Sequence, residues 1–212
     1  MHGFHDSDPA TPPTTSSGPW YKSLNRYHWF VFVVSALGWL FDCLDQQLFV
    51  LARPAAMREL LGGITDPKLL NDSITFYGDI ATSVFIAGWA TGGLIFGILG
   101  DRIGRAKTMM ITILLYSVCT GLSALSRTVY DFAFFRFLTG LGVGGEFAVG
   151  VALVAEVMPA AARPQALASL QALSAVGNIT AALINMGLGI AEGEGMVSSP
   201  WRIMFWIGAL PA

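Results

Sequence analysis

Five apolar runs constrain this chain of 212 residues more than any other feature. They extend approximately over residues 29–51, 77–100, 108–125, 132–155 and 166–190, and about 20 apolar residues suffice for a helix to cross the hydrocarbon layer of a membrane. Backbone amides in lipid must be satisfied within their own segment, and the runs lack the period-two alternation of barrel strands. We therefore predict transmembrane helices.

A sixth apolar run begins at Trp201 and reaches the end of the sequence at Ala212. About 12 residues are too few to span a membrane, so we expect this helix to be incomplete and the polypeptide to be truncated. The domain prediction is a disordered tail over residues 1–26, because its first part is rich in Pro, Ser and Thr and lacks the pattern of a secretory signal, followed by a helical bundle over residues 27–212.

The composition limits the possible partners and cofactors. Only 12% of the residues are charged and 54% are hydrophobic, whereas a soluble domain carries about 25% charged residues. With a net charge of −2 and no basic stripe, nucleic acid is not an expected partner. Cys43 and Cys119 are isolated within apolar runs, and no ligand cluster accompanies them, so we predict neither a metal site nor a cofactor.

Basic residues in the short connections indicate the orientation. Arg102, Arg105 and Lys107 follow the second run and Arg163 follows the fourth, which places these connections and the N-terminus in the cytoplasm by the positive-inside rule. The longest connection, residues 52–76, lies on the opposite side with room for an amphipathic turn. It also carries three basic residues, so the orientation depends on the dense triplet between the second and third runs.

That triplet belongs to a motif, Gly97-Ile-Leu-Gly-Asp101-Arg102-Ile-Gly104-Arg105-Ala-Lys. It closely resembles the signature loop that joins helices two and three in the major facilitator superfamily. The resemblance implies that Asp101 and the arginines form a charge latch whose partners change between conformations. The small residues Gly97 and Gly100 would permit close helix contact.

Two further motifs agree with this resemblance. Arg136 and the glycines that follow it, Gly140, Gly142, Gly144 and Gly145, resemble the R-x-x-x-G-x-G-x-G-G helix of the superfamily. Three of these glycines also fit a dinucleotide-binding G-x-G-x-x-G, but no strand precedes them, so we reject a nucleotide site. Gly140 and Gly144 also form small-residue pairs for helix contact, as do Gly88, Gly92, Gly93 and Gly97 of the second run.

Glu156, Pro159 and Arg163 resemble the E-x-x-P-x-x-x-R loop after helix four in sugar-porter-like members, and Trp201-Arg202 resembles the opening of their helix six. The resemblance therefore implies an all-α membrane protein. The chain would supply the N-terminal six-helix half of a twelve-helix major facilitator fold around a central cavity, with its sixth helix incomplete. The expected partners are lipid, a small solute, a proton and the missing C-terminal half.

Ionisable residues inside the runs are the candidate binding residues, because a charge at the bilayer centre costs at least about 2.5 kcal/mol. Asp42 and Asp45 lie on neighbouring positions of one helix face, cannot ionise independently when so close, and can therefore take up a proton. They also resemble the D-x-x-D of helix one in proton-coupled anion carriers. Asp45 could alternatively lie at the membrane interface. Glu146, deeper in the fourth run, is a second candidate for proton binding.

Arg136 allows two interpretations: it pairs with an aspartate or an anionic substrate, or it locks helix packing. The fifth run carries a polar stripe that could line a cavity or make interhelical hydrogen bonds, worth about 0.6 kcal/mol each. Its members are Gln171, Ser174, Asn178 and Asn185.

We therefore predict a secondary active transporter, a proton-coupled symporter of a small organic acid or other anion that works by alternating access. The predicted gating residues are Gly97, Asp101, Arg102, Gly104, Arg105, Glu156 and Arg163. A sugar transporter of the same fold and a truncated, non-transporting sensor or partner protein are the alternatives. No nucleophile with a base is recognisable, so an enzyme is not expected.

Overall fold

The computed structural model describes residues 20–210, and all its regular elements are helical. A short 3-10 helix, η1 (Trp20–Ser23), precedes five long helices and one short one. These are α1 (Arg26–Leu60), α2 (Pro67–Ile103), α3 (Arg105–Ser123), α4 (Val129–Val157), α5 (Arg163–Gly193) and α6 (Pro200–Gly208). The predicted all-α class is confirmed.

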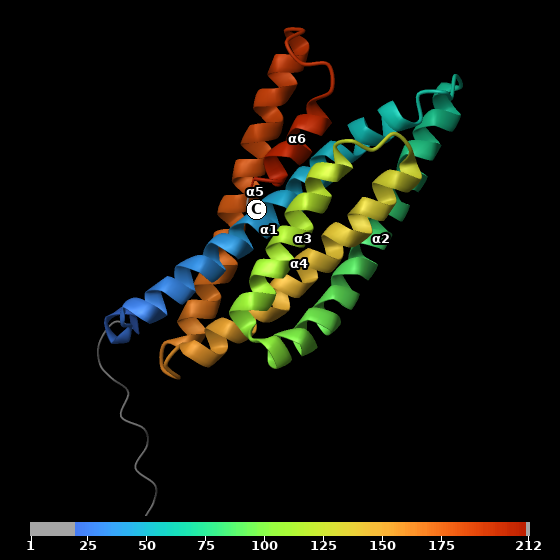
Figure 1. Cartoon of the computed structure of the whole chain (residues 1–212). Helices are drawn as coiled ribbons and strands as arrows, with labels where there is room; N and C mark the ends of the chain where they lie inside the picture. The colour runs from blue at the N-terminus through green and yellow to red at the C-terminus, as the bar shows by residue number, and fades with distance from the viewer. Residues whose placement is uncertain (1–19, 211–212) are drawn as a thin grey trace, which may run out of the picture.

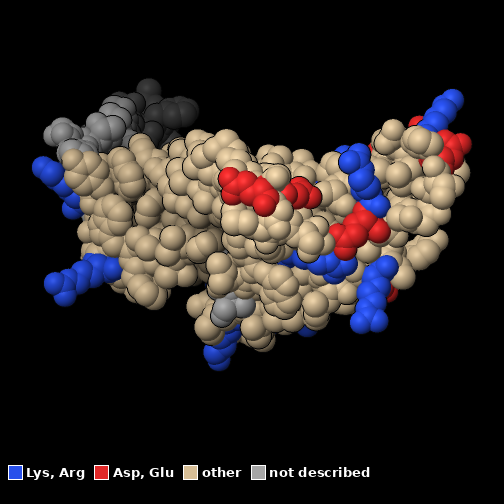
Figure 2. All heavy atoms as spheres, turned by 90° about the horizontal axis from the view of Figure 1, so that it is seen from above, with Lys and Arg blue, Asp and Glu red and all other residues tan. Residues whose placement is uncertain are grey.

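Helices α1 to α5 are long and apolar enough to cross a membrane, and α6 has nine residues. Large apolar side chains point outward from the bundle: Leu94 is 71% exposed, Phe30 67% and Leu183 58%. Uncharged residues cover most of the surface seen in Figure 2, and charged residues gather in a few places. Such a surface suits contact with lipid or with another apolar partner.

The connections alternate between the two ends of the bundle (Figure 1). The start of α1, the α2–α3 junction and the α4–α5 junction share one end, and the other three connections share the opposite end. The basic triplet around Arg102 and the α5 residue Arg163 are thus at the same end as the start of α1. Which end faces the cytoplasm stays a prediction.

Helices α2 and α4 approach closely along a glycine seam. A Cβ placed on Gly88, Gly92, Gly140 or Gly144 would overlap the carbonyl oxygen of Phe137, Leu141, Phe85 or Trp89, respectively. The backbones of the two helices therefore touch at four glycines, as small-residue interfaces in membranes allow. This part of the glycine prediction is confirmed.

The close contact predicted for Gly97 is wrong, because a Cβ there would meet nothing within 4 Å. Instead, the carbonyl oxygen of Gly97 accepts a hydrogen bond from Arg105, 3.3 Å away. Gly100 faces the side chains of Arg105 and Val149. Gly104, with φ 100°, separates α2 from α3, and this backbone conformation suits glycine.

The long connection predicted over residues 52–76 is mostly helical. Helix α1 continues through Pro54 to Leu60, and α2 begins at Pro67, which occupies the first turn where proline is tolerated. Asp66 caps α2 by accepting a hydrogen bond from the backbone N–H of Lys68, at 2.9 Å. Charged residues end an apolar run but need not end a helix, and for this reason the connection was predicted to be longer than it is.

The predicted tail lies partly outside the described residues. Its residues 1–19 are not described, so their disorder stays a prediction. From Trp20 onward the chain has regular structure, in η1 and then in α1, whose first turn is capped by Asn25. The rings of Trp20 and Phe32 lie 6.3 Å apart, so η1 packs against α1.

Candidate functional site

A cavity of about 190 Å³ lies between α1, α4 and α5, and Met109 of α3 adds to its wall. Four polar residues contribute to its wall: Ser35 and Asp42 from α1, Glu146 from α4, and Gln171 from α5. The rest of the wall is apolar and includes the rings of Trp39 and Phe147, whose centroids are 4.8 Å apart. The wall thus combines acids with an apolar surface, as small-molecule sites commonly do.

Asp42 and Glu146 form a carboxyl pair at this cavity. Each is 2% exposed, the two carboxyl groups interact with each other, and apart from that contact none of their four oxygens has a hydrogen-bond partner among the described residues. Gly38 makes room for the pair, because a Cβ at this position would overlap Oε1 of Glu146. Two buried carboxylates repel each other, and one proton shared between them removes that repulsion.

Asp45 and Arg136 form a second, sealed pair. Oδ2 of Asp45 lies 3.7 Å from Nη1 of Arg136, and both side chains are enclosed. Arg136 also donates hydrogen bonds to Ser123 Oγ at 2.8 Å and Thr139 Oγ1 at 3.1 Å. Its guanidinium carbon lies 5.4, 5.9 and 4.6 Å from the ring centroids of Phe49, Phe132 and Phe205.

The two aspartates that the sequence presented as one pair therefore have different partners. Residues three apart on a helix differ by about 60° in direction, and this difference turns Asp42 to the cavity and Asp45 to Arg136. Asp45 is 0% exposed, so its carboxyl group faces the interior of the bundle; its depth in the membrane stays a prediction. Arg136 does not line the cavity, so in this structure it pairs with an aspartate instead of facing a solute.

The polar stripe of α5 is only partly at the cavity. Gln171 lines it, and the hydroxyl of Ser174 donates to the Gln171 carbonyl oxygen at 2.6 Å. Asn178 is exposed and Asn185 half-buried, and neither lines the cavity. These two residues lie beyond the site that the described half provides.

The predicted gating loop is centred on Arg105. Its guanidinium lies 2.5 Å from Asp101 and 3.0 Å from Glu156, so it connects α2, α3 and α4 at one end of the bundle. Arg102 and Arg163 are exposed. The structure thus brings together Asp101, Arg105 and Glu156, with the carbonyl of Gly97, and leaves the other two arginines outside.

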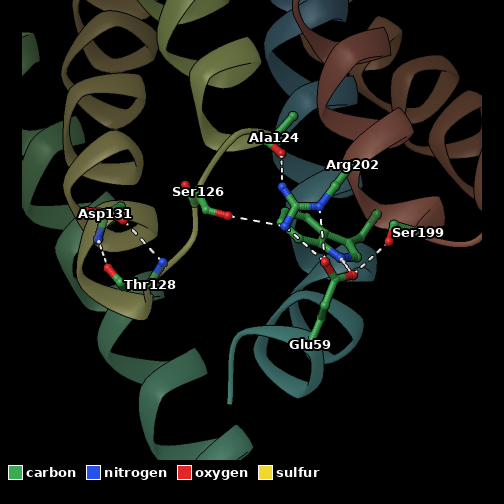
Figure 3. A network of polar contacts seen from close by, with 8 residues as sticks. Glu59, Ala124, Ser126, Thr128, Asp131, Ser199 and Arg202 are labelled. Carbon is green, nitrogen blue, oxygen red and sulfur yellow. Dashed lines mark hydrogen bonds and ion pairs between the residues drawn. The ribbon is translucent and has the colours of Figure 1, made fainter. Parts of the chain in front are cut away.

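A polar network at the opposite end was missed in the sequence. Figure 3 shows Arg202 of α6 between Glu59 of α1 and the carbonyl groups of Ala124 and Ser126, which connect α3 to α4. Nη2 of Arg202 lies 2.9 Å from Glu59 Oε1, and the indole N–H of Trp201 donates to Glu59 Oε2 at 2.7 Å. We call this network the Glu59–Arg202 clamp.

The clamp holds α6 over the sealed pair. Gly208 of α6 is so close that a Cβ there would lie 2.7 Å from Asp45 Oδ1, and the neighbouring Cys119 of α3 is 4% exposed.

We expect Arg202→Gln to loosen α6 and to raise the rate at which a hydrophilic thiol reagent modifies Cys119, measured in a Cys43→Ser background. The exposed Arg127 provides the control, since Arg127→Gln should leave the rate unchanged; equal rates in both variants would contradict the role of the clamp.

Ser35, Trp39 and Phe147 were also missed at the cavity. Ser35 and Trp39 precede Asp42 by seven and three residues, so all three lie near one helix face, and Phe147 directly follows Glu146. The helical spacing around Asp42 was a usable signal. The pairing of Asp42 with Glu146 had none, because it depends on how α1 and α4 pack.

Five apolar helices with buried acids at a cavity, and an arginine-centred loop between α2 and α3, define a multi-pass membrane protein of the major facilitator superfamily. The chain belongs to the sugar (and other) transporter family, whose profile matches residues 46–212. Its relatives are transporters and not enzymes.

Curated relatives cover most of the chain. A putative metabolite transport protein of Haemophilus influenzae is 33% identical over 90% of this chain and 42% of its own length. The benzoate transport protein of Acinetobacter baylyi is 33% identical over 90% and 38%. The sialic acid transporter NanX of Escherichia coli is 35% identical over 91% and 43%. The chain thus spans less than half the length of these relatives.

The fold matches a solved structure as well. A partially occluded inward-open conformation of the xylose transporter XylE from E. coli superposes with a TM-score of 0.71 over 88% of this chain and 46% of that one. At 21% identity this likeness shows the fold alone. The predicted N-terminal half of a major facilitator fold is confirmed.

Proposed function

We propose that the full-length protein is a secondary active transporter that moves a small organic acid together with a proton, and that Asp42 and Glu146 take up the proton. The observation that carries this proposal is a pair of buried carboxyl groups at the wall of a cavity, with no hydrogen-bond partner among the described residues other than each other. Buried acids in a membrane helix are costly, and they commonly mark proton or substrate paths.

The relatives support the class of solute. Two of them carry organic acids by name, benzoate and sialic acid. A sugar is the second candidate, because Glu156 of the sugar-porter-like loop binds Arg105 and a glucose transport protein of Synechocystis is 36% identical over 63% of this chain. A non-transporting sensor is the third, and it would show no uptake at all.

Uptake by the full-length protein in proteoliposomes tests the proposal. We expect an acidic exterior to stimulate uptake of an organic acid, and Asp42→Asn to remove this stimulation, because the neutral amide cannot take up the proton. Asp72, exposed near the start of α2, provides a matched control: Asp72→Asn should transport like the wild type. An uptake rate that does not change with the pH gradient, or full stimulation in Asp42→Asn, would overturn the proton-binding role. Competition of uptake by sugars but not by organic acids would favour the second candidate.

A further inference from the structure

The charges at the cavity are all of one sign. Asp42 and Glu146 line it, and none of the described lining residues is a lysine or an arginine. Arg136, the buried cation of the bundle interior, is 0% exposed and is committed to Asp45, Ser123 and Thr139. A solute carboxylate placed here would meet negative charge with no compensating cation from this half, which is unfavourable in a partly dry site.

The unpartnered polar atoms of the wall match a different chemical group. Ser35 Oγ and Trp39 Nε1 are buried and have no hydrogen-bond partner among the described residues. Apart from their contact with each other, the same is true of the carboxyl oxygens of Asp42 and Glu146. The hydroxyl and the indole N–H can donate, while the carboxyl oxygens can accept. A group that carries a carbonyl oxygen beside an O–H or N–H would satisfy both kinds of atom at once.

The remaining wall is apolar and small. Trp39 and Phe147 present neighbouring aromatic rings, and Leu167 and Leu170 add aliphatic surface from α5. The cavity volume of about 190 Å³ is below the roughly 300–1,000 Å³ of typical ligand sites, so this half offers space for about one ring. A sugar, with hydroxyl groups on every side, would leave several of them against apolar side chains.

We infer that this half binds the uncharged head group of a ring-bearing solute: an undissociated carboxylic acid or the corresponding carboxamide. The O–H or N–H of the solute donates to the Asp42–Glu146 pair, its carbonyl oxygen accepts from Trp39 Nε1 or Ser35 Oγ, and its ring lies against Trp39 and Phe147. The inference rests on the proposed function and names its substrate class. An acid therefore binds together with one proton, which its carboxyl group shares with the Asp42–Glu146 pair, whereas an amide needs none.

Benzoate and benzamide test this inference, because they have nearly the same shape and differ in charge. Binding to the purified full-length protein is measured by calorimetry between pH 5.5 and 7.5, with glucose as a third ligand. We expect benzamide to bind at least tenfold more tightly than benzoate at pH 7.5. The affinity for benzoate should rise by up to tenfold for each unit by which the pH falls, because the undissociated acid becomes more abundant.

Two variants separate the charge argument from a loss of folding. In Asp42→Asn/Glu146→Gln the negative charge is gone, so the preference for benzamide over benzoate should fall at least tenfold. Trp39→Phe keeps a ring but removes the N–H, and it should weaken both ligands equally. A variant that still binds benzoate or benzamide is shown by that binding to be folded.

Three results would overturn the inference: benzoate binding at pH 7.5 with benzamide excluded, glucose binding with neither ring compound bound, or an unchanged preference in the double variant. If a different acid is still taken up with a proton, the proposed function stands and only the substrate class is wrong. If no solute is transported but benzamide binds as expected, the proposed function is wrong and the binding site stands.

Discussion

Arg136→Gln is expected to destabilise the full-length protein severely. The carboxylate of Asp45 is 0% exposed, and the substitution removes the cation that it pairs with. The buried charge would then lie among the aromatic rings that surround the pair. Breaking one partner out of a buried ion pair typically costs about 3–5 kcal/mol. Thermal unfolding in detergent, followed by loss of the monodisperse peak in size-exclusion chromatography, measures the effect.

The double variant Asp45→Asn/Arg136→Gln is the control for this prediction. It removes both charges, so no lone carboxylate remains, and we expect it to recover a large part of the lost stability. Wild-type unfolding behaviour in Arg136→Gln, or a double variant less stable than the single one, would show that the pair does not hold the helices as described.

Gly144→Ala should separate α2 from α4. The new Cβ would overlap the carbonyl oxygen of Trp89, in the middle of a seam where four glycines contact the opposite backbone. Backbone atoms cannot yield as a flexible side chain does, so we expect a cost at or above the roughly 1–3 kcal/mol of overpacking. The unfolding temperature in detergent and the yield of folded protein should both fall.

Gly97 supplies the matched control for Gly144. It also lies in a membrane helix, but a Cβ there would meet nothing within 4 Å. Gly97→Ala should therefore unfold at or slightly above the wild-type temperature, since alanine favours a helix more than glycine does. Equal behaviour of the two variants would mean that the seam is not packed as the structure shows it.

Local features of the sequence were sufficient for the helices and the glycine seam. The length of each apolar run predicts a span, and the spacing of Gly140 and Gly144 predicts a face on which helices approach. Helix ends were less predictable, because the helices extend beyond the apolar runs into segments that contain charged residues. Helix α1 ends at Leu60, and α2 begins at Pro67. The apolar run measures the hydrocarbon layer, and the helix is longer.

The contacts of the site depend on packing, and the sequence could not supply them. Asp42 and Asp45 share a helix, yet α4 offers Glu146 to one and Arg136 to the other. Glu59 and Arg202 are 143 residues apart, so neither residue alone indicated a clamp. The motif resemblance located Arg105 correctly at a charge cluster but could not distinguish it from the exposed Arg102.

We propose that Asp42 and Glu146 together exchange a proton at the cavity when a solute binds. Calorimetry of an organic acid binding to the full-length protein, repeated at one pH in buffers of different ionisation enthalpy, counts that proton directly. We expect uptake of about one proton per bound acid in the wild type and a large reduction in Asp42→Asn/Glu146→Gln. Binding without proton uptake in the wild type, or equal uptake in the double variant, would contradict it.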